Sequence, residues 1–226
     1  MRLPRSQRAP RIDGRFDKGE WACRGASGPF VHPGTGRADP NSGVHAEAWG
    51  AWDDRALYLA FRVYDSKPIS PFRRDDEDPH LWEKSSAIEL MLQPGERVDN
   101  RDYYELQVDV HAAVWDTFFE DYNHPIVQRP GEGPRFGHQR WQSGLERAVS
   151  IQRGRDYVIE IALPWSALDR HAAARRPKAG ERWRANFYSF REGQRDALAW
   201  SPLLGQGNFH RSARFGMLRF VGPCAP

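Results

Sequence analysis

The sequence predicts an all-β fold, an antiparallel and jelly-roll-like β-sandwich with one short helix. Several segments alternate apolar and polar residues, which is the pattern of strands that bury one face and expose the other. Stretches rich in Gly and Pro, at 25–43 and 130–137, lie between such segments and predict long loops. Helical patterning is limited to one stretch, which excludes a parallel α/β fold, because there helices alternate with strands.

Four segments show the alternation clearly. Residues 56–64 place four apolar side chains on one face and mostly polar or aromatic side chains on the other. Residues 87–92 do the same and leave Glu89 on the face away from the core. Similar half-buried strands are predicted over 104–110 and 157–163.

The one predicted helix covers residues 164–174. Pro164 suits the first turn, where its missing N–H leaves no hydrogen bond unmade. Three alanines at 172–174 favour the helical conformation. The stretch is short, so the helix is expected to be a minor element of a β fold.

The length and composition fit one folded unit. Sandwiches of 226 residues are common, and no repeat or linker divides the chain, so residues 1–226 are predicted as a single domain. The chain has 9 Trp, 12 Phe and 7 Tyr, more aromatic area than a core of this size needs. Because Tyr and Trp suit surfaces that stack on ligands, some of these rings are expected to be functional.

The charge pattern argues against nucleic acid as a partner. The 33 basic and 30 acidic residues nearly balance, and the basic ones are scattered rather than gathered into a stripe. No apolar run approaches the roughly 20 residues of a membrane-spanning helix. The first residues lack the apolar region of a signal peptide. The expected location is therefore extracytoplasmic if a signal has been removed, and cytoplasmic otherwise.

The two cysteines lie at opposite ends of the chain. Terminal strands of sandwiches are often neighbours, so Cys23 and Cys224 can form a disulfide if the protein is exported. Two free thiols are the alternative.

A search for catalytic and metal-binding motifs gives one weak candidate. No phosphate-binding loop, Gly-x-Ser-x-Gly turn or Cys/His cluster with zinc spacing is present. Asp75, Asp76 and Asp78 form an acidic run that could bind a structural calcium ion, which prefers several oxygen ligands. The alternative interpretation is a solvated charged loop between strands.

Polar side chains recur on the non-core face of separate predicted strands. Glu89, Gln107, Asp109 and Glu160 would form one row across a sheet if those strands pair. Carboxylates and side-chain amides bind adjacent sugar hydroxyls in pairs, and aromatic rings stack on the C–H faces of the sugar ring. The alternative is an ordinary wet sheet face without a ligand.

Six motifs follow one another in a characteristic order: Ile12-Asp13-Gly14 with Glu20-Trp21, Trp52-Asp53-Asp54 before Leu57-Tyr58, Trp82-Glu83 before Ile88-Glu89, Tyr157-Val158-Ile159-Glu160 with Leu163-Pro164-Trp165, Trp183-Arg184-Ala185-Asn186 with Trp200-Ser201-Pro202, and Phe209 to Phe220. In this order the sequence resembles the family 9 carbohydrate-binding modules from about residue 8 to residue 221.

The resemblance implies a non-catalytic domain that binds the end of an oligosaccharide or polysaccharide. By motif position, Trp82 and Phe209 are the two rings that sandwich a terminal sugar. The polar contacts to its hydroxyls would come from Glu89, Gln107 and Asp109, with a further contact from Arg191. Trp52 and Trp165 are expected in the core instead.

Two other functions are compatible with the same residues. The first is a glycan-active enzyme that uses Glu89, Asp109 or Glu160 as acid and base. The second is a subunit for electron transfer that binds b-type haem, as some relatives of this sandwich do, with Met91, Met217 or a histidine as axial ligand.

Overall fold

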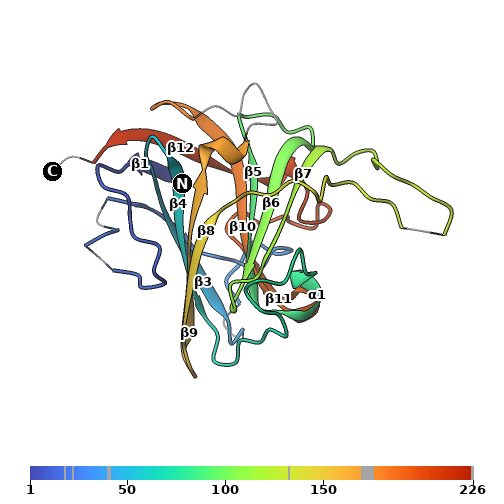
Figure 1. The fold of residues 1–226 in the computed structure, drawn as a ribbon, viewed down its shortest axis with the longest axis horizontal. Helices are drawn as coiled ribbons and strands as arrows, with labels where there is room; N and C mark the ends of the chain where they lie inside the picture. Colours follow the sequence, from blue (N-terminus) through green and yellow to red (C-terminus); the bar gives the residue numbers. More distant parts are fainter. Residues whose placement is uncertain (18, 22, 40–41, 132, 169–175, 225–226) are drawn as a thin grey trace.

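The strands of the chain form one strongly curled sheet whose two halves face each other (Figure 1). The computed structural model describes residues 1–17, 19–21, 23–39, 42–131, 133–168 and 176–224. Within these residues the strands are β1 (Arg2–Arg5), β2 (Gly25–Pro29), β3 (His45–Trp52), β4 (Ala56–Tyr64), β5 (Ala87–Gln93), β6 (Arg101–Asp109), β7 (Val114–Asp121), β8 (Glu146–Gln152), β9 (Asp156–Pro164), β10 (Arg182–Arg191), β11 (Arg195–Ala199) and β12 (Gly216–Pro223).

The order of the strands creates the two layers of the sandwich. Along the sheet the order is β7-β6-β5-β10-β12-β1-β3-β4-β9-β8, with β11 beside β10 and β2 beside β3. One layer is built around β5, β6, β7 and β10, the other around β3, β4, β8 and β9, and β12 and β1 connect them (Figure 1). The pairings are antiparallel as predicted, except that β1 runs parallel to both β12 and β3.

The predicted strands and their core faces are confirmed. The segment predicted over 56–64 is β4, and the other three segments lie within β5, β9 and, apart from residue 110, β6. The core between the layers contains Leu59 and Phe61 from β4 together with Leu90 from β5 and Leu106 from β6. It also contains the two tryptophans predicted there, Trp52 and Trp165, which are 3% and 7% exposed.

The described part of the predicted helix is one short helical turn that begins one residue later than predicted. Pro164 is the last residue of β9, and residues Trp165–Leu168 form a single turn of 3-10 helix, η1. Residues 169–174 of the predicted helix lie outside the described residues. The other short helical elements are α1 (Leu81–Lys84), η2 (Glu192–Gln194) and η3 (Ser212–Arg214). The predicted loop at 25–43 also contains a strand, β2, in its first residues.

The outer face of β4 and β9 is buried as well, because the chain before β2 folds over it. Trp21 is fully buried there and packs with Tyr58, Ala60 and Ala162. Glu160 on β9 accepts hydrogen bonds at Oε2 from the backbone N–H of Asp13 (3.1 Å) and Gly14 (2.8 Å). At Oε1 it accepts one from Trp21 Nε1 (2.9 Å). Glu160 therefore anchors the N-terminal segment, and its predicted place in a row with Glu89 is wrong.

The variant Glu160→Gln is expected to lower the free energy of unfolding by about 2 kcal/mol, since a buried donor left without a partner costs roughly 1–3 kcal/mol. An amide has one acceptor oxygen, so its NH₂ group would face either the two backbone N–H groups or the Trp21 indole. Thermal melts by circular dichroism measure the effect, with Glu146→Gln, an exposed residue on the neighbouring β8, as the control. Equal melting temperatures for wild type and Glu160→Gln would contradict this role.

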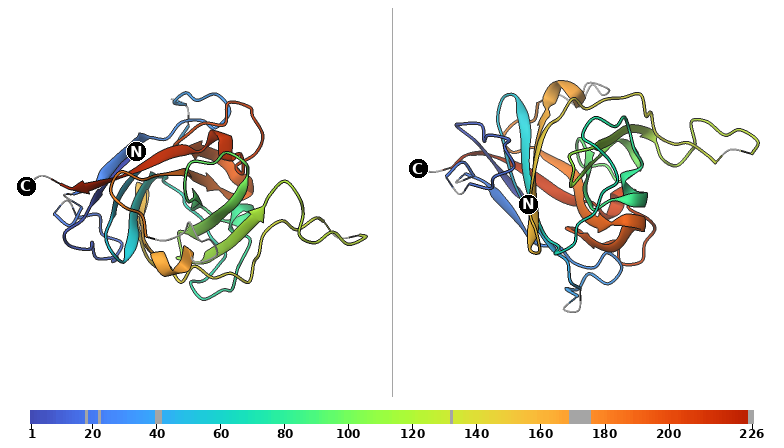
Figure 2. Two further views of the ribbon diagram at one scale, coloured as in Figure 1. Left: turned by 90° about the horizontal axis from the view of Figure 1, so that it is seen from above. Right: turned by 60° about the horizontal axis from the view of Figure 1, so that its bottom comes forward.

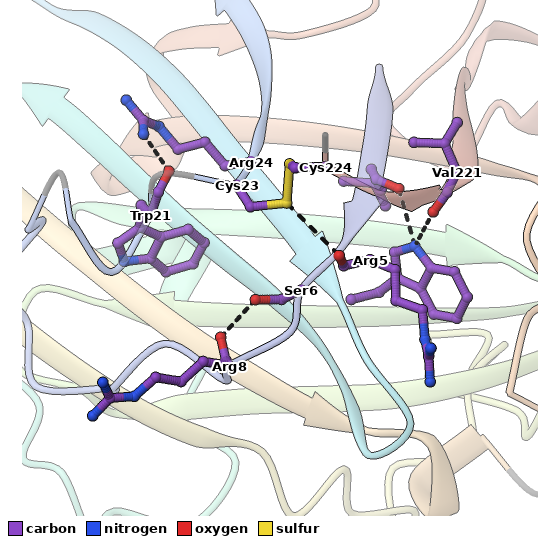
Figure 3. The surroundings of a disulfide bond; sticks show 10 residues. Arg5, Ser6, Arg8, Trp21, Cys23, Arg24, Val221 and Cys224 are labelled. Carbon is purple, nitrogen blue, oxygen red and sulfur yellow. Dashed lines mark hydrogen bonds between the residues drawn. A yellow bond between two sulfur atoms is a disulfide. The ribbon is translucent and has the colours of Figure 1, made fainter. Parts of the chain in front are cut away.

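The ends of the chain are joined by a disulfide bond between Cys23 and Cys224, 201 residues apart in sequence (Figure 3). Of the two alternatives from the sequence, the bridged one is therefore correct. The bond ties the segment just before β2 to the residue that follows β12. Near it, Trp52 Nε1 donates to the carbonyl oxygens of Leu3 and Val221, so the same corner is also held by hydrogen bonds.

Candidate functional site

A pocket of about 460 Å³ lies on the outer face of β5, β6 and β7, opposite the core. Two long segments form its sides: residues 122–139, between β7 and β8, and residues 203–210, before β12. Figure 2 shows the first of these, in yellow-green, extending away from the rest of the molecule. The lining residues are Trp82, Glu89, Glu105, Gln107, Trp115, Thr117, Phe119, Tyr122, Pro134, Arg135, Phe136, Gly137, Gln139, Gln194, Leu203, Gly207, Asn208, Phe209 and His210.

Strand register brings the polar residues of the pocket floor together. Glu89 on β5 is paired with Gln107 on β6, and Glu105, two residues earlier, is paired with Thr117 on β7. Side chains two residues apart on a strand share a face, so these four lie on the outer face. The segment 122–139 is tied to this floor, because a Cβ atom on Gly137 would come within 2.5 Å of Thr117 Oγ1.

The amide of Gln107 joins the two acids. Its Nε2 donates to Glu89 Oε2 at 2.9 Å and to Glu105 Oε1 at 2.8 Å. The two carboxyl groups also hydrogen-bond to each other. The amide oxygen Gln107 Oε1 and the hydroxyl oxygen Thr117 Oγ1 are buried on the same floor without a partner. Buried polar atoms are nearly always hydrogen-bonded in proteins, so these two atoms point to a polar ligand group in the pocket.

The two acids hold protons more tightly than usual. Burial raises the pKa of Glu89 well above its ordinary range, and the neighbouring Glu105 raises it further. Burial likewise raises the pKa of Glu105 to about 8, although the hydrogen bond from Gln107 lowers it. In the empty pocket at neutral pH, the charge of the pair is therefore partly neutralised by bound protons.

His210 is neutral and lies between Tyr103 and Glu105. Burial lowers the pKa of His210 to about 3, so the ring carries one proton at neutral pH. Nδ1 of the ring hydrogen-bonds with the Tyr103 hydroxyl at 2.8 Å, and burial raises the pKa of that hydroxyl strongly. Nε2 of the ring lies 3.7 Å from Glu105 Oε2.

Aromatic rings form the sides of the pocket above this floor. Trp82, on α1, packs edge-to-face against Trp115 on β7, with ring centroids 4.9 Å apart. His80 stacks on Trp82 at 4.5 Å and Tyr188 stacks on Phe209 at 4.0 Å. One face of each of these two predicted sugar-binding rings is thus covered by protein, which leaves the other face for a ligand.

Two predicted binding residues lie outside the pocket. The Asp109 carboxylate accepts hydrogen bonds from the backbone N–H groups of His111 and Ala113, so it holds the turn between β6 and β7. Its other oxygen accepts from the Ser70 hydroxyl. Arg191 forms an ion pair with the buried Asp65. Both side chains are engaged by the fold itself, so the pocket contains Trp82, Glu89, Gln107 and Phe209 from the predicted set, but neither of these two.

The acidic run has other partners. Asp76 accepts a hydrogen bond from the backbone N–H of Arg73, and Asp78 accepts one from Gln142. In the part of the chain that the structure describes, no group of three or more His, Cys, Asp or Glu residues is arranged to hold a metal ion. Calcium binding by Asp75, Asp76 and Asp78 stays a prediction.

The methionines considered as haem ligands are not among the residues that line the pocket. Met91 is fully buried on the outer face of β5 against Tyr103, Tyr188 and Phe215, in one cluster with the pocket residue Phe119. Met217 is a half-buried residue of β12 whose carbonyl accepts a hydrogen bond from the N-terminal amine.

Several pocket residues were not singled out as binding residues from the sequence. Trp115 and Thr117 lie on the outer face of β7, and the content of Val, Trp, Thr and Phe in residues 114–119, rather than an alternation, is the signal that indicates this strand. The alternation of residues 104–110 places Glu105 on the same face as Gln107, which is its signal in the sequence. No local pattern reveals that His210 packs flat on Tyr122 at 4.0 Å.

A β-sandwich with a pocket that combines polar side chains and aromatic rings is typical of a carbohydrate-binding domain. The chain belongs to the carbohydrate family 9 binding domain-like family, whose sequence profile matches residues 12–222. No helix of the described residues has the length and apolar character needed to cross a membrane.

Solved structures agree with this assignment at the level of the fold. A family 9 carbohydrate-binding module from Caldicellulosiruptor kristjanssonii in complex with cellotriose is 16% identical, covers 100% of both chains and has a TM-score of 0.64. Its complex with glucose is 15% identical, covers 100% of this chain and 98% of that one, and has a TM-score of 0.61. A Bacteroides uniformis protein to which carbohydrate binding has been attributed is 17% identical, covers 97% of this chain and 98% of that one, and has a TM-score of 0.70. The curated proteins contain no significant sequence match.

Proposed function

We propose that the chain binds the end of a glycan in this pocket and leaves it chemically unchanged. The observation that carries the proposal is the pocket itself, whose lining combines the rings of Trp82 and Phe209 with the polar residues Glu89, Glu105, Gln107 and Thr117 of the floor. Adjacent sugar hydroxyls can donate to and accept from such neighbouring polar groups. The complexes of the Caldicellulosiruptor module with cellotriose and glucose support the same class of ligand.

The aromatic rings provide the apolar part of the contact. A sugar ring presents C–H groups on its faces, and these pack against the flat face of an aromatic side chain. Trp82 and Phe209 both line the pocket and each is held rigid by a ring stacked on its other face. Rigid rings lose little conformational entropy on binding, so the contact contributes more to affinity than a mobile side chain would.

The position of Gln107 favours binding over catalysis. In glycosidases two carboxyl groups flank the bond that is cleaved, with the substrate between them. Here Glu89 and Glu105 hydrogen-bond to each other, and both accept from the Gln107 amide. Two carboxyl groups in direct contact leave no room for a scissile bond between them.

Trp82→Ala is expected to weaken glycan binding at least tenfold while the domain stays folded, because tenfold corresponds to about 1.4 kcal/mol and buried aromatic contacts commonly exceed that value. Trp82 is half-buried on a short helix at the pocket and lies outside the main core. Affinity electrophoresis on a panel of soluble glycans, beside a thermal melt, measures both effects. Trp49→Ala, a half-buried tryptophan on β3 that packs on Phe16, is the matched control. Unchanged retention of the folded Trp82→Ala variant would contradict the proposed site.

A further inference from the structure

The turn between β10 and β11 holds one residue in a backbone conformation that its side chain disfavours. Register pairs Arg191 with Arg195, so residues 192–194 form a three-residue hairpin loop. Gly193 and Gln194 both have positive φ, 66° and 55°. Hairpin loops of this length commonly place a residue in the left-handed region, where glycine is favoured because it has no Cβ atom. Gln194 therefore lowers the stability of a turn that glycine would form without strain.

The other residues in this conformation have local reasons for it. Seven described residues other than glycine have positive φ, and four of them are Asp or Asn, which tolerate the left-handed region. Ala112 lies in the turn that Asp109 holds, and the side chain of Leu204 lies against Gly36. Gln194 has no such reason, and it alone among these seven residues lines the pocket.

The side chain of Gln194 is available to a ligand. It is exposed, and among the described residues its amide forms no hydrogen bond. The turn η2 that contains it contacts the helix α1 that carries Trp82, so the amide and the Trp82 ring belong to adjoining parts of the pocket wall. A side-chain amide has both donors and an acceptor, so it can donate to one sugar hydroxyl and accept from the next.

We propose that Gln194 is a specificity-determining residue whose amide binds two adjacent free hydroxyls of the sugar that stacks on Trp82. The inference rests on the proposed function and names the part of the sugar that this side of the pocket recognises. Backbone strain is commonly retained at residues that contact a ligand, because the side chain is needed there. A sugar that lacks one of the two hydroxyls leaves one end of the amide without a partner.

Two variants separate the amide from the backbone. Gln194→Met keeps the length of the side chain and the strain but removes the hydrogen bonds, so we expect about fivefold weaker binding and an unchanged melting temperature. Gln194→Gly also relieves the strain, so we expect equally weak binding and a melting temperature about 1–4 °C above that of wild type. Gln152→Met, at an exposed glutamine on β8, is the matched control and should change neither quantity.

Isothermal titration calorimetry with cellotriose, xylotriose, mannotriose and N-acetylated chitotriose, beside thermal melts, measures both effects. Monodeoxy analogues of the trisaccharide that binds most tightly then locate the contact. At two adjacent positions the loss of a hydroxyl should weaken binding to wild type but not to Gln194→Met, because the partner of that hydroxyl is already absent from the variant.

The possible results separate this inference from the proposed function. Wild-type affinity in Gln194→Met, or equal losses for wild type and variant with every deoxy analogue, would overturn the inference and leave the proposed function intact. A melting temperature of Gln194→Gly at or below that of wild type would show that the turn is not strained for the sake of the amide, and would also overturn it. Failure of the folded wild-type domain to bind any trisaccharide or any glycan of a broad panel would overturn both.

Discussion

The double variant Cys23→Ser, Cys224→Ser is expected to unfold about 10–15 °C below the wild-type domain, since 1 kcal/mol shifts the melting temperature of a chain of this size by roughly 2–4 °C. The bond closes almost the whole chain into a loop, because its cysteines are 201 positions apart in the sequence. In the chain-entropy model, removing a crosslink that closes a loop of this length lowers the free energy of the unfolded chain by about 5 kcal/mol, which destabilises the folded domain by the same amount. Calorimetry or circular dichroism melts measure the difference.

Reductant provides the control for this prediction. Wild-type protein with a reducing agent should melt near the temperature of the serine variant, and the serine variant should not respond to reductant. If the serine variant and the oxidised wild type had the same melting temperature, the bond would not constrain the unfolded chain. Because disulfides persist in oxidising compartments, the bond also favours a location outside the cytoplasm.

The second large effect is on the pH dependence of stability. In the unfolded chain Glu105 has its ordinary pKa of 4.5, whereas in the folded chain burial raises it to about 8. Between these values the folded state binds the extra proton, so stability falls as pH rises through this window. One pKa unit corresponds to about 1.4 kcal/mol, so the domain should be roughly 3 kcal/mol more stable at pH 5 than at pH 8. Glu89, and Glu160 with a pKa of about 7, act in the same direction.

The variant Glu105→Gln should flatten this pH profile and be about 2 kcal/mol more stable than wild type at pH 8. Glutamine keeps an acceptor for the Gln107 amide but has no proton to lose, so the charge that disfavours the buried state at high pH is removed. Urea melts from pH 5 to pH 8 measure the profile, and Glu146→Gln, an exposed residue, should follow the wild-type curve. Parallel curves for Glu105→Gln and wild type would contradict the assignment of the proton to this pair.

The strands of the sandwich could be predicted because alternation is a local property. The core residues Leu59, Leu90 and Leu106 were assigned correctly from spacing alone. The surroundings of the outer sheet faces could not be predicted in this way, because the solvent exposure of these faces depends on which other segments fold over them. Trp21 and the N-terminal segment cover Glu160, and two distant segments cover Glu89. The same alternation places both glutamates away from the core, but the two side chains contact different segments of the chain.

Trp82, Glu89 and Phe209 were chosen by motif order and Gln107 by its place on the polar strand face, and all four line one pocket, while their contact with a ligand stays a prediction. Asp109 lies outside the pocket because its nearest hydrogen-bond donors are in its own turn, and a short acidic side chain at a strand end commonly binds such backbone groups.

The sequence by itself determined the β-sandwich, the family and four residues of the pocket, because period-two alternation and motif order are carried by the chain in one dimension. Only the tertiary structure decided that Cys23 and Cys224 are bonded, that Gln107 joins Glu89 to Glu105, and that His210 is neutral beside them. These facts depend on distances between strands and loops remote in sequence, and on the burial that those contacts create. Burial and partner, rather than residue type, set whether a carboxyl group anchors a loop, holds a turn or awaits a ligand.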